Sequence, residues 1–201
     1  CASDTRGWNQ PTSTGASDFS SEITQWSLDN WGEDTGTYNP LTVRWSNQED
    51  YTNWVPSISS TSGEVILADG TKIVGARRSR NAINIWTDNA LWSMTFVGPP
   101  FTFQFSQLGT NCGLIAQHSG VDYDGRAVWM GYDNFYTFDG QVKSLDCTVR
   151  RYIFDRLNMS QKDKIFCGIN SEFKEVIWLY PSTNSTECDS YVVWSPDENY
   201  W

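Results

Sequence analysis

The sequence predicts an all-β protein built from repeated four-stranded antiparallel sheets, as in a β-propeller. Three observations support this prediction: short apolar runs separated by turn residues, an aromatic content of 15%, and tryptophans that recur at similar intervals. The 201 residues are enough to bury a sizeable core. A β-sandwich in which the tryptophan spacing is coincidental is the alternative fold.

The first part of the chain differs in composition from the rest. Residues 1–24 are rich in Ser, Thr, Gly and Asp and lack periodicity, which predicts an extended N-terminal arm. Trp8 in this arm is a candidate contact with a neighbouring subunit, or else a lone exposed aromatic residue. Residues 25–201 are predicted to form the propeller-like domain. The join at residues 34–37 is too short to complete a sheet, so we expect an incomplete propeller with residues missing there.

Strand-like runs follow this join. An alternating strand spans Leu41 to Trp45, and four further runs at 64–67, 72–76, 82–86 and 90–97 are predicted to form one small antiparallel sheet.

The segment after these runs is the candidate interface. Pro99 and Pro100 cannot donate ladder hydrogen bonds, so they predict a crossing to another sheet. Phe101, Phe103 and Phe105 then alternate, which places them on one face that a core or a partner must cover. Pro99, Pro100, Phe101 and Phe103 are therefore, with Trp8, the predicted subunit contacts.

The C-terminal third holds a meander and one helix. Residues 126–145 contain three apolar runs with a hairpin signal at Asp139-Gly140. Val149, Ile153 and Leu157 recur at helical spacing, which predicts one short helix around 148–158 with Thr148 as its cap. Three more strands are predicted at 165–169, 174–180 and 190–194.

The tryptophans that end apolar runs define the repeat. Trp45, Trp86, Trp129 and Trp178 are separated by 41, 43 and 49 residues. A period of roughly 40 to 50 residues with about four strands in each unit is typical of propeller blades.

No catalytic constellation is visible, so we expect no enzymatic activity, no cofactor and no metal site. His118 is the only histidine and lies outside any nucleophile-elbow pattern. A sialidase-like box is approached at 122–129, but its Gly-to-Trp interval is one residue too long, and the box is not repeated. The five cysteines are too widely spaced for a CxxC site; free buried thiols are expected, with one or two disulfides as the alternative.

The charge balance is acidic. The chain has 14 Lys and Arg against 24 Asp and Glu, a formal net charge of −10. The only dense cationic cluster is Arg77, Arg78 and Arg80, which argues against a surface that binds nucleic acid tightly. DNA in transit is still compatible with an acidic wall, because such a wall repels it. No apolar run reaches the ~18 to 20 residues of a membrane-spanning helix, so no membrane-spanning segment is expected.

Several motifs taken in order resemble one protein family. The chain carries WSLDNWGED, VRWSNQEDYTNWVPS, ADGTKIVGARRSRNAINIWTDNALWSMTFVGPPFTFQ, GTNCGL, WMGYDNFYTFDGQVKSLDCTVRRYIFDRLN and SEFKEVIWLYPS. This succession, over about Gln25 to Trp201, resembles the tail tubular or nozzle-type proteins of tailed bacteriophages. The chain departs from the family at 33–42, where family members carry a longer stretch.

The resemblance implies a β-propeller-containing structural subunit of the virion. Such a subunit assembles with copies of itself in a ring below the portal and adaptor, and forms part of the conduit for DNA ejection. The implied partners are adaptor and fibre proteins, with DNA only in transit. The implied location is the virion tail, assembled in the host bacterial cytoplasm. The alternatives are a glycan-binding or glycoside-cleaving surface propeller and a general protein-interaction propeller.

Overall fold

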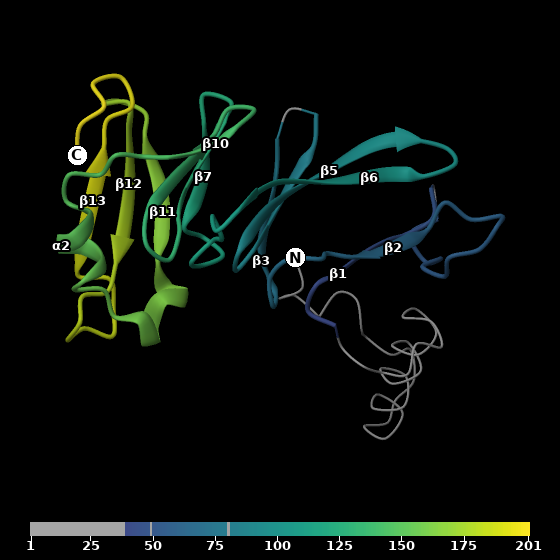
Figure 1. Ribbon diagram of the computed structural model, residues 1–201, viewed down its shortest axis with the longest axis horizontal. Coiled ribbons are helices and arrows are strands. Elements are labelled where there is room, and N and C mark those ends of the chain that lie inside the picture. The colour runs from purple at the N-terminus through teal and green to yellow at the C-terminus, as the bar shows by residue number, and fades with distance from the viewer. Residues whose placement is uncertain (1–38, 49, 80) are drawn as a thin grey trace, which may run out of the picture. The chain divides into compact units, whose positions relative to one another are not determined.

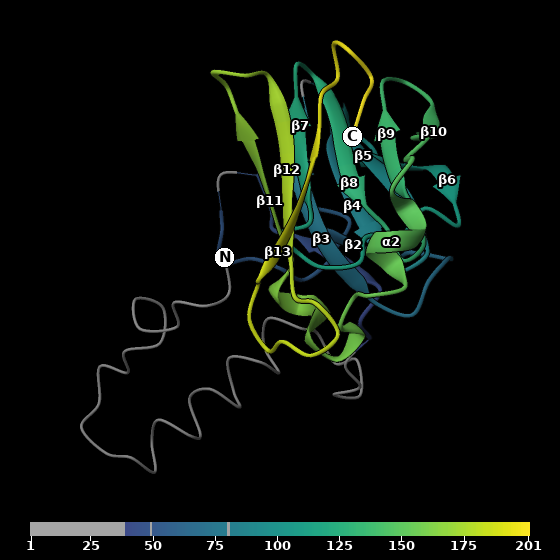
Figure 2. The same ribbon diagram turned by 90° about the vertical axis from the view of Figure 1, so that its left-hand side faces the viewer.

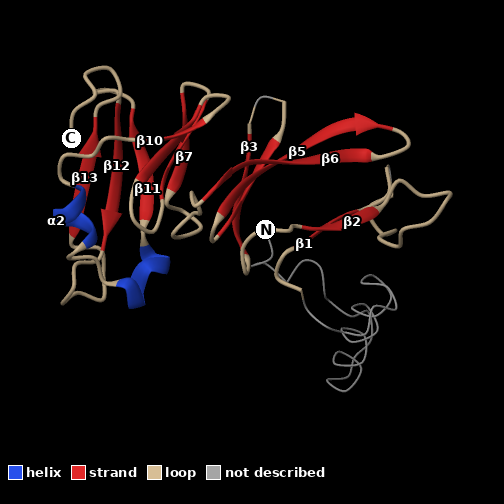
Figure 3. Cartoon of the chain, viewed as in Figure 1, coloured by secondary structure: helices blue, strands red, loops and turns tan. Residues whose placement is uncertain are grey.

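The computed structural model describes residues 39–201 except 49 and 80. Strands dominate these residues and form four antiparallel sheets (Figure 3). An all-β fold was predicted, and at this level the prediction is confirmed. The chain divides into two compact units, one ending at Ile66 and the other spanning Leu67–Trp201, and each is described by itself. Trp8, the predicted arm at 1–24 and the short join at 34–37 lie outside the described residues.

The described part of the first unit contains one two-stranded sheet. Strand β1 (Thr42–Trp45) pairs with β2 (Gly63–Ile66), and Trp45 lies directly opposite Gly63. A Cβ atom at Gly63 would lie 2.4 Å from the Trp45 ring, so only glycine fits there. Asn47 caps the intervening loop, because its Oδ1 accepts hydrogen bonds from the Thr61 amide and hydroxyl, both at 2.8 Å.

Sheet A is the first sheet of the second unit. Its strands, in spatial order, are β3 (Ile73–Arg78), β4 (Ile83–Thr87), β5 (Ala90–Gly98) and β6 (Thr102–Thr110). Two expectations are wrong here. The run at 64–67 is β2 and pairs with β1, and Pro99-Pro100 joins two neighbouring strands of one sheet instead of crossing to another. The prolines lie in the turn, where no ladder hydrogen bond is required of them.

Sheet B is the predicted meander with one strand added before it. Its strands are β7 (Gly120–Tyr123), β8 (Arg126–Met130), β9 (Phe135–Phe138) and β10 (Val142–Ser144). The Asp139-Gly140 turn joins the last two strands, and Gly140 has a φ of +113°, which favours glycine. The hairpin signal in the sequence is therefore confirmed.

Sheet C has three strands and is preceded by the helical segment. Its strands are β11 (Phe166–Asn170), β12 (Glu175–Tyr180) and β13 (Ser190–Trp194). The helix predicted around 148–158 is present as the shorter α2 (Arg150–Phe154), and a 3-10 helix, η1 (Met159–Lys164), follows it. Thr148 is not the cap: Val149 occupies that position, and no side chain caps the helix.

The three sheets stack face to face through two cores (Figure 1). The core between sheets A and B contains Trp86 and Trp129, whose rings meet edge to face at 5.5 Å. The core between sheets B and C contains Phe135 and Trp178, with ring centroids 4.8 Å apart. The side chains of β8 point alternately into one core and into the other, so sheet B is covered on both faces.

The tryptophan repeat has a structural counterpart in these sheets. Trp86, Trp129 and Trp178 each lie in the second strand of their sheet and are almost fully buried. They lie opposite a small residue of the first strand, namely Gly75, Gly120 and Cys167 in that order. The alignment of these three tryptophans is therefore confirmed. The predicted four strands in each repeat hold for sheets A and B but not for sheet C.

Candidate assembly interface

The hairpin formed by β5 and β6 extends past its own sheet. Pairing of β4 with β5 ends at Ile83 opposite Met94, whereas pairing of β5 with β6 continues to Gly98 opposite Thr102. The end of the hairpin is therefore a two-stranded projection beyond β4, visible in Figure 1 as the long pair of strands labelled β5 and β6. We call residues 95–104 the hairpin tip.

The turn at the tip is built from residues suited to sharp bends. Gly98 has a φ of +78° and Thr102 a φ of +58°, and the Pro99-Pro100 bond is cis. A Cβ atom at Gly98 would meet nothing within 4 Å. The space beside Gly98 is therefore open.

Apolar side chains crowd the tip. Phe96 and Phe103 lie opposite each other, with ring centroids 5.7 Å apart in an edge-to-face arrangement. Phe96 is 64% exposed, Val97 47% and Phe101 76%. Three large exposed apolar groups therefore lie within a few residues of one another, and exposed apolar surface of this kind is typical of sites of protein interaction.

Charge is absent from the hairpin and from its surroundings in sequence. Between Asp88 and Asp122 the chain contains no Asp, Glu, Lys or Arg, although its formal net charge is −10. Interface cores are depleted of charged residues and enriched in aromatic ones. The hairpin tip has that composition.

Four of the predicted contact residues lie in the hairpin tip. Pro99, Pro100 and Phe101 are exposed and adjacent in the turn, whereas Phe103 is half-buried on β6. Trp8 lies outside the described residues, so the structure does not place it. Phe96 and Val97 are not among the contacts predicted from the sequence, because the pattern of Pro99-Pro100 predicts a crossing from one sheet to another. A hairpin interpretation would have placed Phe96 opposite Phe103.

Polar side chains anchor the base of the hairpin. The carboxylate of Asp69 accepts hydrogen bonds from Asn89 Nδ2 at 2.6 Å and Gln107 Nε2 at 2.7 Å. Asp88 accepts from the amide of Thr71 at 2.7 Å and also from its hydroxyl. Burial tends to raise the pKa of Asp88, but these hydrogen bonds outweigh it and lower the pKa from its usual value. The network holds the β4–β5 turn and the end of β6 against residues 69–71.

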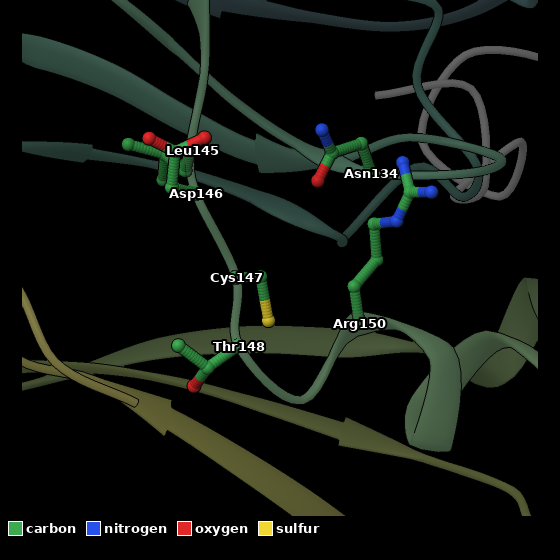
Figure 4. A pocket seen from close by; sticks show the side chains of 6 residues that line it. All are labelled: Asn134, Leu145, Asp146, Cys147, Thr148 and Arg150. Atoms are coloured by element: carbon green, nitrogen blue, oxygen red, sulfur yellow. The ribbon is translucent and has the colours of Figure 1, made fainter.

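Two open pockets in the second unit offer other places for a ligand. One, of about 250 Å³, is lined by Asn134, Leu145, Asp146, Cys147, Thr148 and Arg150. Figure 4 shows Arg150 extending from the start of α2 toward Asn134. This pocket has one carboxylate and no aromatic ring in its lining.

The other pocket, of about 430 Å³, adjoins the start of β13. It is lined by Tyr152, Arg156, Tyr180, Ser182, Thr183, Asn184 and Ser190. Its lining has two tyrosines and no carboxylate. A glycoside-cleaving site needs paired carboxylates, and neither of these two pockets supplies them.

The four cysteines that the structure describes lie in surroundings that disfavour the thiolate. The four that the structure describes are unpaired, and of these Cys112 and Cys167 are buried, as predicted. Burial raises the pKa of Cys112 to about 11 and that of Cys167 to about 12. Burial also raises the pKa of the half-buried Cys147 and Cys188. All four thiols therefore stay protonated at neutral pH, and a protonated thiol is a poor nucleophile.

His118 contributes its backbone to the fold. Its carbonyl oxygen accepts a hydrogen bond from the Cys167 amide at 2.8 Å, which ties sheet C to the segment before β7. Within residues 39–201, apart from 49 and 80, no group of three or more His, Cys, Asp or Glu could hold a metal ion. In the same part of the chain, no helix has the length and apolar character needed to cross a membrane.

Neither a family model nor a curated protein sequence matches the chain.

Proposed function

We propose that this chain is a structural subunit of a ring-forming assembly, the tail tube or nozzle of a tailed bacteriophage. The observation that carries the assembly role is the hairpin tip, a projecting, uncharged and aromatic surface on a strongly acidic chain. The phage context rests on the resemblance described above. On this proposal the protein is not an enzyme, and its sheets supply a rigid wall.

The proposed architecture is a β-propeller of which sheets A, B and C are consecutive blades. Each of the three sheets is antiparallel and places a tryptophan of its second strand in a core between sheets. A sandwich has two packed sheets, whereas here a third sheet continues the stack. Repetition of one packing pattern therefore favours the propeller over the sandwich.

The remaining partners follow from charge and from the resemblance. Copies of the same chain are the proposed neighbours within the ring, and adaptor and fibre proteins are the proposed neighbours in the tail. A net charge of −10 suits a conduit wall that repels DNA in transit and does not bind it. The proposed location is the virion tail, assembled in the cytoplasm of the host bacterium.

The test is the assembly state of the purified chain. Light scattering during size-exclusion chromatography should give a mass of several subunits, and negative-stain electron microscopy should show rings or tubes. Phe101→Asp should weaken assembly, because it places a charge in the uncharged tip. Tyr152→Asp on α2, at an aromatic residue that is 59% exposed, is the control and should leave assembly intact. A chain that stays monomeric at high concentration contradicts the proposal.

A further inference from the structure

Sheet C carries large apolar residues on both faces. Phe166, Leu179 and Tyr191 lie directly opposite one another across β11, β12 and β13, so their side chains share one face. They are 53%, 38% and 70% exposed. The neighbouring residues Cys167, Trp178 and Val192 point the other way, into the core shared with sheet B.

A second apolar row extends this exposed face. This row lies two residues along each strand from the first and is half-buried. It consists of Gly168, Ile177 and Val193, which lie opposite one another. The Phe166 ring leans toward Gly168, where an added Cβ would lie 3.4 Å from it. We call these two rows the outer face of sheet C; Figure 2 shows its three strands in front of those of sheet B.

The pattern of sheet C is that of an inner sheet of a stack. An antiparallel sheet with one face in water alternates apolar and polar residues. Sheet B, which is covered on both faces, is apolar on both, and sheet C has the same character although its outer face is exposed. The outer face therefore resembles a packing surface and not a solvated one.

We propose that the outer face of sheet C receives the hairpin tip of a second copy of this chain. This inference rests on the proposed assembly role and names the two surfaces that meet. Both surfaces are free of charge in their apolar rows, whereas the chain carries −10 overall. Two copies repel each other less where they meet through uncharged surfaces. A two-stranded hairpin laid on a three-stranded sheet also continues the face-to-face packing already seen within the unit.

The geometry makes this contact heterologous. The hairpin belongs to sheet A, and sheet C lies at the other end of the A–B–C stack within Leu67–Trp201. Each copy therefore presents one donor surface and one acceptor surface, on opposite ends of one unit. Head-to-tail contacts of this kind generate rings when the rotation closes. An isologous contact between two tips would leave the outer face uncovered.

The test uses two variants, each of which removes one surface. Phe101→Asp removes the donor and Tyr191→Asp the acceptor, and both side chains are well exposed in the free chain. Alone, each variant should be monomeric at concentrations where the natural chain assembles. Mixed in equal amounts they should form a heterodimer and nothing larger, because one intact donor and one intact acceptor remain. Near-ultraviolet circular dichroism checks the fold, and Leu179→Asp replaces Tyr191→Asp if that variant is unfolded.

Each other outcome overturns the inference. If Tyr191→Asp and Leu179→Asp both assemble like the natural chain, the outer face is not the acceptor, although the proposed assembly role stands. If the two variants do not associate when mixed, the contact is not head to tail. If the chain assembles through the outer face only after residues 1–38 are deleted, the arm of the same chain is the occupant of that face. If the natural chain never assembles, the proposed function fails together with the inference.

Discussion

At the scale of single residues, equivalent tryptophans play unequal roles. Trp129 Nε1 donates a hydrogen bond to the Cys112 carbonyl at 2.8 Å, and Trp178 Nε1 donates to the Ser119 carbonyl at 2.9 Å. Trp86 Nε1 is buried and has no partner among the described residues. Trp129 and Trp178 therefore hold neighbouring segments by a hydrogen bond as well as by packing, whereas Trp86 contributes packing alone.

This difference predicts unequal costs for the same substitution. Trp129→Phe leaves the buried Cys112 carbonyl without a partner, which should cost about 1 to 3 kcal/mol beyond the loss of packing. Trp86→Phe is the matched control, because it removes an N–H group that has no hydrogen-bond partner within the described part of the chain. Urea unfolding should show the larger loss of stability for Trp129→Phe. Equal losses would mean that the hydrogen bond contributes nothing.

A carboxylate at the base of the hairpin predicts a dependence on pH. The pKa of Asp88 is lowered on folding, so its hydrogen bonds stabilise the protein above the unfolded-state pKa near 3.8 and are lost as the pH falls through the lower folded pKa. Asp88→Asn should cost about 1.5 kcal/mol at pH 7 and much less once the pH lies below the lowered folded-state pKa. The measurement is the unfolding free energy across pH. Asp122→Asn, at an exposed residue, is the control, and an equal pH profile for the two variants would exclude this role.

At the scale of elements, the connection from β6 to β7 locks two sheets together. The Cys112 amide donates to the Asn89 carbonyl at 2.9 Å, and the Leu114 amide to the Thr87 carbonyl at 3.1 Å. Between them Gly113 lies so close to the β4–β5 turn that an added Cβ would be 2.0 Å from the Asp88 carbonyl oxygen. The absence of a side chain at this glycine is what lets the connection lie against the turn.

Gly113→Ala should therefore be strongly destabilising. The added methyl group collides with backbone atoms, which cannot rotate away, and overpacking of this kind costs about 3 kcal/mol. Gly168→Ala is the control, because its Cβ would meet only the Phe166 ring at 3.4 Å. Thermal unfolding should show a large drop for the first variant and little change for the second. Similar melting temperatures would contradict the described packing of this connection.

Local patterns predicted the strands well, and their partners less well. The runs around Trp129 and Trp178 alternate with turn residues, so the limits of β8, β9 and the three strands of sheet C follow from the sequence to within a residue or two, whereas β7 was not predicted. Pairing depends on turn geometry and on contacts distant in sequence. Pro99-Pro100 therefore concealed a hairpin, and with it the contribution of Phe96 to the candidate interface.

At the scale of the whole molecule, the proposed contact surface is uncharged, whereas the rest of the chain is acidic and repels other copies. The formal net charge is −10, yet the hairpin tip contains no charged residue. Copies that meet through uncharged surfaces repel each other through the rest of their charge. Added salt screens that repulsion, because the Debye length falls from about 30 Å at 0.01 M to about 8 Å at 0.15 M.

Assembly should consequently strengthen as salt is added. Sedimentation velocity at pH 7.5 in low and moderate NaCl should show a larger assembled fraction at the higher ionic strength. An interface held by ion pairs would respond in the opposite direction, because salt screens attraction as well as repulsion. Phe101→Asp should remain monomeric at both salt concentrations, since screening does not restore the lost apolar contact. Dissociation of the natural chain by moderate salt would show that charged residues, and not the hairpin tip, hold the copies together.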